Sequence, residues 1–283
     1  MKTKIIKLLT ITTILISFLG CTEKDDDSLL GESKTPAVIV IRHAIDVNEG
    51  APHPGPLTFQ FFKTIELSID GKIQPPEKTD SIYIPIFRNL LCNNSGYKRA
   101  DDLGIGLQQF IEDNNLAPVS EVISINPPKD YDSGTPNPFL TIAPYITNMQ
   151  EKTTGLPDDK LKLTLYNSHD YIASRFDGNL LIKDGFSSII SWEATGMWQV
   201  ERHGGYNENT ILPQLVKEDQ IDLVMPKPIW ATTIYLFTNI DNGRFDLQKY
   251  DFSVQGDGED KEYIFTKCDN NSCTEDKPEC KKE

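Results

Sequence analysis

An arginine and a histidine are adjacent in the sequence, directly after a strongly apolar run. The run is Ala37-Val38-Ile39-Val40-Ile41, and Arg42-His43 follows it. A guanidinium group can hold two oxygens of a phosphoryl group, and a neutral imidazole beside it can act as a nucleophile. A continuous β-branched run predicts a strand buried on both faces. Because ligand sites in open α/β sheets lie beyond the carboxyl ends of the strands, this pair is the leading candidate site.

Two other clusters contain residue types that occur in catalytic or metal sites. Ser168-His169-Asp170 has the residue types of a catalytic triad, but neighbouring side chains on a helix point in different directions and cannot line up. Cys268, Cys273 and Cys280 have no histidine nearby, which argues against a zinc site. The acidic stretch 255–260 does not have the spacing of a calcium loop. The sequence therefore predicts neither a metal nor a cofactor.

The elements that would position the Arg42-His43 pair alternate between strands and helices. Strands are predicted from apolar or alternating runs, and helices from apolar stripes of helical spacing. We expect strands at 37–41, 119–125, 161–165, 188–192, 232–238 and 245–252, with helices at 98–114 and 139–152, a helix beginning at Ser168, and a helical region up to Leu215. Residues 46–95 are expected to be irregular, because prolines interrupt them. This order predicts a single three-layer α/β/α sandwich with a mainly parallel sheet.

The first twenty residues have the pattern of an export signal. Three lysines precede an apolar run of about twelve residues at 8–19, which is too short to span a bilayer as a stable helix. Gly20-Cys21 resembles the cleavage site of bacterial lipoproteins, which would make Cys21 the lipidated first residue of the mature protein. The acidic stretch that follows predicts a solvated tether over residues 21–35. We expect a lipid-anchored outer-membrane protein displayed at the cell surface, or alternatively one that faces the periplasm.

The acidic composition of the chain argues against one class of binding partner. The chain has 283 residues and a formal net charge of −14, with 28 basic and 42 acidic side chains. Nucleic acid is therefore not expected as a partner, because binding to phosphate backbones relies on a basic surface. Export would place the four cysteines other than Cys21 in an oxidising compartment where disulfides persist, and the pairing of Cys92 with the tail cysteines stays open.

Several segments, taken in order, resemble the histidine phosphatase superfamily, which has the phosphoglycerate-mutase-like fold. The resemblance spans most of residues 36–255, and residues 256–283 are expected to form an acidic tail. The matching segments are Ala37 to Ala44, which resembles the RHG/RHA signature, Leu90 to Ala100, Pro138 to Pro144, Ile189 to Glu193, and Trp230 to Phe237.

The resemblance assigns roles to individual positions. It implies that Arg42 clamps the phosphoryl oxygens and that His43 is the nucleophile, with Glu193 or Asp46 as the nearest candidates for a general acid. The second arginine of such phosphatases would fall at Asn137, and the second histidine at Ala194. Losing one preorganised transition-state donor typically costs about 10²–10³ in rate. The sequence thus predicts phosphomonoesterase activity that is impaired or lost, with binding of a phosphorylated small molecule or surface ligand retained. The alternative is a non-catalytic surface module that binds a protein or a glycan.

Overall fold

The computed structural model describes residues 33–43, 57–60, 63–75, 81–84, 93–127, 137–167, 178–197, 209–224 and 233–268. The chain divides into two compact units, Met1–Lys34 and Thr35–Glu283, and every element described below belongs to the second. Cys21, Asp46 and Cys92, the expected helix at Ser168, and Cys273 and Cys280 all lie outside the described residues.

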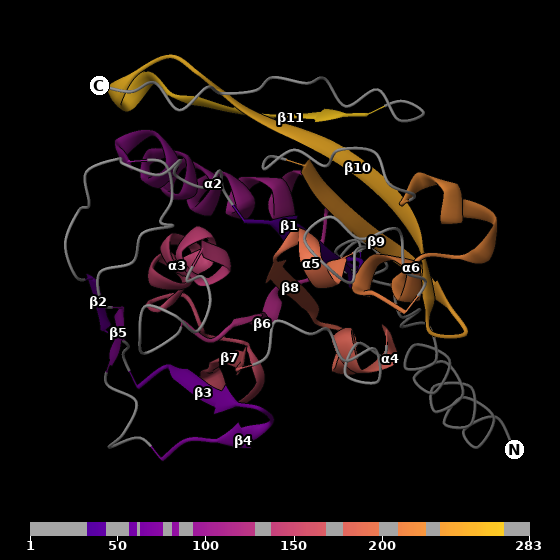
Figure 1. Cartoon of the computed structure of the whole chain (residues 1–283), viewed down its shortest axis with the longest axis horizontal. Coiled ribbons are helices and arrows are strands. Elements are labelled where there is room, and N and C mark those ends of the chain that lie inside the picture. Colours follow the sequence, from indigo (N-terminus) through magenta and orange to yellow (C-terminus); the bar gives the residue numbers. More distant parts are fainter. Residues whose placement is uncertain are drawn as a thin grey trace, which may run out of the picture. The chain divides into compact units, whose positions relative to one another are not determined.

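A nine-stranded mixed sheet forms the centre of this unit (Figure 1). Its strands, in spatial order, are β11 (Glu262–Lys267), β10 (Arg244–Gln255), β9 (Thr233–Asp241), β1 (Val38–Arg42), β8 (Ser187–Trp192), β6 (Val119–Ile125), β7 (Leu161–Tyr166), β3 (Ile65–Ile69) and β4 (Lys72–Ile73). The five strands from β1 to β3 in this order run parallel to one another, and antiparallel strands flank them on both sides. The protein is therefore an α/β protein whose mixed sheet has a parallel core. A separate hairpin pairs β2 (Leu57–Gln60) with β5 (Ser81–Ile84).

Two long helices and several short ones accompany the sheet. The long ones are α2 (Asn93–Asp113) and α3 (Asn137–Met149), and the short ones are α4 (Gly178–Leu181), α5 (Ala194–Met197) and α6 (Ile211–Leu215). Single 3₁₀ turns occur at η2 (Pro157–Asp159), η4 (Lys183–Gly185) and η6 (Gly258–Asp260), and a longer one at η5 (Glu218–Leu223).

Alternate residues of the strands build two separate hydrophobic clusters. In β1, Ile39 and Ile41 belong to a cluster that includes the buried side chains of α2 and α3. Val38 and Val40 belong to the other cluster, together with Met197 of α5 and the apolar residues of α6. Successive side chains of a strand point to opposite faces of its sheet. The first face of the sheet therefore packs against α2 and α3, and the second face against α5 and α6.

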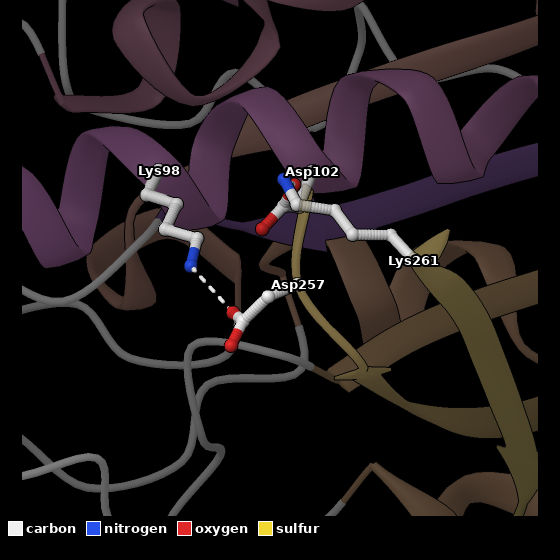
Figure 2. A network of polar contacts seen from close by, with 4 residues as sticks. All are labelled: Lys98, Asp102, Asp257 and Lys261. Atoms are coloured by element: carbon white, nitrogen blue, oxygen red, sulfur yellow. Dashed lines mark hydrogen bonds and ion pairs between the residues drawn. The ribbon is translucent and has the colours of Figure 1, made fainter. Parts of the chain in front are cut away.

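The strand β11 and the residue before it contact α2 through an aromatic pair and an ion pair. Phe265 lies with its ring centroid 4.8 Å from that of Phe110 in α2. Lys261, just before β11, donates from Nζ to Oδ1 of the buried Asp102 on the same helix, at 2.5 Å. Figure 2 shows this pair beside a second, solvent-exposed pair, Lys98 and Asp257, whose charged atoms are 3.8 Å apart.

Most of the predicted elements are confirmed. The strand expected at 119–125 is found with those bounds, and the other five expected strands and both long helices are present with ends shifted by a few residues. The prediction that residues 46–95 are irregular is wrong, because β2, β3, β4 and β5 lie there. The region expected to be helical up to Leu215 contains α5 and α6 among its described residues. The sheet also extends past residue 255, since β11 lies within the acidic segment 256–283.

Candidate anion-binding site

The carboxyl ends of the five parallel strands lie along one edge of the sheet. The last residues of these strands are, in spatial order, Arg42, Trp192, Ile125, Tyr166 and Ile69. In open α/β sheets, ligands bind in the crevice at this edge, where neighbouring strands send their following segments to opposite faces. A ligand-binding site is therefore expected at this edge.

The first described elements after β1 and after β8 pack on opposite faces of the sheet. The first described element after β1 is β2, whose Phe59 packs edge-on against Phe139 of α3 with centroids 5.3 Å apart, on the first face. The segment after β8 is α5, whose Met197 is buried in the cluster of the second face. The strands β1 and β8 are neighbours in the sheet, so the first described elements that follow two adjacent strands pack on opposite faces. Arg42 is the last residue of β1, and His43 directly follows it.

The backbone around Arg42 and His43 is held by the end of β8. Arg42 lies in register with Trp192, and the backbone N–H of His43 donates to the carbonyl oxygen of Trp192 at 3.1 Å. Arg42 is half-buried, whereas His43 is only 5 % exposed. The backbone of the pair is therefore held at the end of β8, and little of the imidazole is open to solvent.

Arg42 lies on the second face of the sheet, where its charge influences a buried tyrosine. Arg42 follows Val38 and Val40 in the alternation of β1, so it belongs to their face. Burial raises the pKa of Tyr235 on β9 well above its ordinary value; the positive charge of Arg42 lowers it, and the negative charge of Asp251 raises it further. The charges of Arg42 and Asp251 therefore act on the same phenol with opposite signs.

The start of α3 lies against the end of β8 on the first face. Ser191 donates from Oγ to the carbonyl oxygen of Pro138 at 2.7 Å, and Thr141 donates to the carbonyl oxygen of Asn137 at 2.8 Å. Asn137 has no exposed surface. The position at which the resemblance expects a second arginine is therefore a fully buried helix start, where an unpaired guanidinium would be costly.

The remaining predicted site residues lie close to the end of β8 or outside the described chain. Glu193 is half-buried and joins β8 to α5, and Ala194 is the first residue of α5. Glu193 follows Trp192 directly, so this candidate acid is next to the strand end that holds His43. Asp46, the other candidate, is not among the described residues.

A row of polar side chains at the same edge was not predicted from the sequence. Asn126 follows β6 and donates from Nδ2 to Oδ1 of Asn167, which follows β7, at 2.7 Å. Asn167 in turn donates from Nδ2 to Oδ2 of Asp70, which follows β3, at 2.6 Å, and its backbone N–H reaches Oδ1 at 3.1 Å. Each residue is the first or second polar position after a strand, which is the signal that could have identified them. They extend the polar edge away from Arg42 across three strand ends.

Within the described ranges, no group of three or more His, Cys, Asp or Glu side chains could hold a metal ion. No helix in the same part of the chain is both long and apolar enough to cross a membrane. Cys268 is disulfide-bonded. Comparisons with protein-family models, with characterised proteins and with solved structures found no match.

Proposed function

We propose that the domain binds a phosphorylated ligand at the carboxyl ends of β1 and β8, with Arg42 and His43 as its anion-binding groups. The observation that carries the proposal is the place of this pair at the carboxyl end of a parallel strand, where the backbone of His43 is hydrogen-bonded to Trp192 at the end of the neighbouring strand. An arginine guanidinium can hold two phosphoryl oxygens at once, and a histidine ring N–H can donate a further hydrogen bond. The proposed fold is the three-layer α/β/α sandwich of the histidine phosphatases, anchored to the outer membrane through Cys21.

Hydrolysis at this site is proposed to be weak or lost. In an active enzyme, Nε2 or Nδ1 of His43 would attack phosphorus while the ester P–O bond breaks. Glu193 or Asp46 would protonate the departing alkoxide, and water would then cleave the phosphohistidine. Asn137 and Ala194 stand where the resemblance expects the second arginine and the second histidine. The near-complete burial of His43 also restricts the approach of a phosphorus atom in line with the imidazole nitrogen.

An assay of phosphomonoester hydrolysis tests whether the site turns over a phosphorylated ligand. The chain from residue 21 onward would be incubated with p-nitrophenyl phosphate, beside the His43→Ala variant and a Lys267→Ala control on the exposed part of β11. We expect turnover close to the uncatalysed rate for all three proteins. Robust turnover that disappears only in His43→Ala would contradict an impaired site and establish a working phosphatase.

The second candidate is a surface module that binds a protein or a glycan and does not use the phosphoryl pocket. The near-complete burial of His43 favours it, because little of the imidazole is open to a ligand. If the same protein neither hydrolyses p-nitrophenyl phosphate nor binds inorganic phosphate, this candidate is favoured over the first.

A further inference from the structure

A polar cavity of about 450 Å³ opens on the second face of the sheet, at the part of the sheet formed by β3, β7 and β6. The turns η2 and η4 and the helix α4 also line it. Neither Arg42 nor His43 is among the described residues that line this cavity. Its volume lies in the range of small-molecule sites, about 300–1,000 Å³. It is therefore separate from the proposed anion site and large enough for a ligand of its own.

The cavity exists because two parallel strands are apolar on one face only. In β7, Leu161, Leu163 and Leu165 are fully buried in the first cluster, and Lys162 points to the other face. The strand β3 repeats the pattern, with Ile65 and Leu67 in the same cluster and Glu66 lining the cavity. Strands of a parallel sheet are normally buried on both faces by helices. Here the second face of β3 and β7 carries polar side chains that border an open space.

Charged side chains cross the floor of the cavity in register. Glu66 is the partner of Lys162 on the neighbouring strand, and Lys162 is the partner of Glu121 on the next. Lys162 Nζ lies 3.0 Å from Oε1 of Glu121, and the hydroxyl of Thr164 donates to the same oxygen at 2.6 Å. These two contacts fix the orientation of the Glu121 carboxylate. A fixed acceptor costs less conformational entropy when a ligand binds than a freely rotating one.

The rim of the cavity offers donors and acceptors of both charges. Asp158 and Lys160 line it from the segment at η2, and Lys183 and Asp184 from the turn η4. Because both ammonium and carboxylate groups line the cavity, an anion would meet carboxylates and a cation would meet lysines. A ligand whose groups each donate and accept hydrogen bonds matches such a rim, and hydroxyl groups have this property.

Apolar and aromatic side chains also line the cavity. Leu180 of α4 is 61 % exposed, and Tyr166 is half-buried with its ring centroid 6.1 Å from that of Trp192. Ile123 of β6 lines the same space. A ligand that fits must therefore combine hydroxyl groups with an apolar face. A pyranose ring has both, since its C–H groups form a flat apolar surface and its hydroxyls project from the rim.

We propose that this cavity binds an uncharged pyranose sugar of one or two rings. The carboxylate of Glu121 accepts from sugar hydroxyls, the ammonium of Lys183 donates to them, and Tyr166 and Leu180 contact the C–H face. The site goes beyond the proposed phosphoryl site and does not depend on it.

Titration of the chain from residue 21 onward, observed by ¹H–¹⁵N NMR, tests the assignment. The probes are glucose, galactose, mannose, N-acetylglucosamine, cellobiose and lactose, each added separately. We expect at least one sugar to shift amide signals of β6, β7 and η4 in a saturable way. Lys183→Ala and Glu121→Gln should each weaken this binding at least tenfold, because each removes a hydrogen bond to a charged group. Lys72→Ala, on the exposed strand β4 of the same sheet, is the matched control and should not change it.

The outcomes distinguish the two sites. Sugar binding that survives Arg42→Ala and the addition of inorganic phosphate would place the sugar in the cavity and leave the phosphoryl site to be judged separately. The assignment is overturned if none of the six sugars binds. It is also overturned if both cavity variants, with unchanged melting temperatures, bind as the parent does, or if inorganic phosphate or spermidine displaces the sugar from these amides.

Discussion

Ser124 of β6 and Ser191 of β8 lie opposite each other in register, and both are completely buried on the face that packs against α3. Ser191 donates from Oγ to the carbonyl oxygen of Pro138 at 2.7 Å. Among the described residues, the hydroxyl of Ser124 has no hydrogen-bond partner. Two identical side chains on adjacent strands therefore make opposite contributions to stability, next to the edge that carries Arg42 and His43.

The first prediction compares alanine substitutions of these two serines. Ser191→Ala removes a buried hydrogen bond and should lower the free energy of unfolding by about 1–2 kcal/mol. Ser124→Ala removes a buried, unsatisfied hydroxyl and should be neutral or stabilising by up to about 1 kcal/mol. Urea unfolding followed by circular dichroism measures both. Equal destabilisation by the two substitutions would mean that the hydroxyl of Ser124 is satisfied.

The second prediction concerns the close contact between α2 and α3. A Cβ atom on Gly104 would lie 2.7 Å from the backbone nitrogen of Tyr145 and 2.8 Å from Cβ of Pro144. Gly104→Ala would gain about 1 kcal/mol of helix propensity at an exposed position. At this contact we expect it to lower the free energy of unfolding by about 1–3 kcal/mol, because the helices must move apart.

The neighbouring Ile105→Ala variant serves as its control, because Ile105 is an exposed residue of the same helix and its loss should cost no more than about 0.5 kcal/mol. A stabilising effect of Gly104→Ala in the same urea series would show that the two helices are not in contact at this point.

The third prediction concerns the attachment of β11 to α2. Lys261→Met leaves the Asp102 carboxylate buried without its ammonium partner, so the urea midpoint should fall clearly. The hydrogen bond to Asp102 raises the pKa of Lys261 above 10.5, so this contribution is complete below that pH and is lost as pH rises through the higher folded value. Lys98→Met breaks only the exposed pair with Asp257 and should have little effect. Equal urea midpoints for Lys261→Met and Lys98→Met would show that the pair of Lys261 with Asp102 does not stabilise the attachment of β11.

The fourth prediction concerns acid unfolding. Lys217 Nζ lies 2.9 Å from Oδ1 of Asp246, and this hydrogen bond lowers the pKa of Asp246 below its ordinary value of 3.8. The stabilisation is therefore present above pH 3.8 and is lost as pH falls through the lower, folded-state pKa. Compared with Asp246→Asn, the parent protein should be more stable near neutral pH by at most about 1 kcal/mol, since the pair is partly exposed to solvent. The difference should vanish in strong acid; a constant difference across the titration would argue against the pair.

Sequence patterns were sufficient to predict the strands that are buried on both faces. Val38–Arg42 and Ser187–Trp192 are continuous apolar or small-residue runs, and such runs predict central strands without knowledge of their partners. The position of Arg42 and His43 at the carboxyl end of the first of these strands followed directly from that pattern. The register that pairs Arg42 with Trp192 did not, because it is set by pairing between segments 150 residues apart.

The elements that were missed depend on long-range contacts. The strand β3 alternates between apolar and polar side chains, which is a strand signal, but it is only five residues long and is held in the sheet by pairing with β7 and β4. The strand β11 lies in an acidic segment and is held by β10 and by α2 through Phe110 and Asp102. The cavity on the second face is lined by residues from four strands and the turns beside them, a combination that no local pattern indicates.

The central claim is that Arg42 and His43 form a phosphoryl-binding site, and calorimetric titration with inorganic phosphate tests it most directly. The chain from residue 21 onward should bind phosphate saturably, and Arg42→Ala should weaken that binding at least tenfold, because a charge-assisted bidentate contact is lost. Lys267→Ala, which removes a positive charge from the exposed part of β11, should bind as the parent does. Phosphate binding that is undetectable in the parent chain, or that Arg42→Ala leaves unchanged, would contradict the claim.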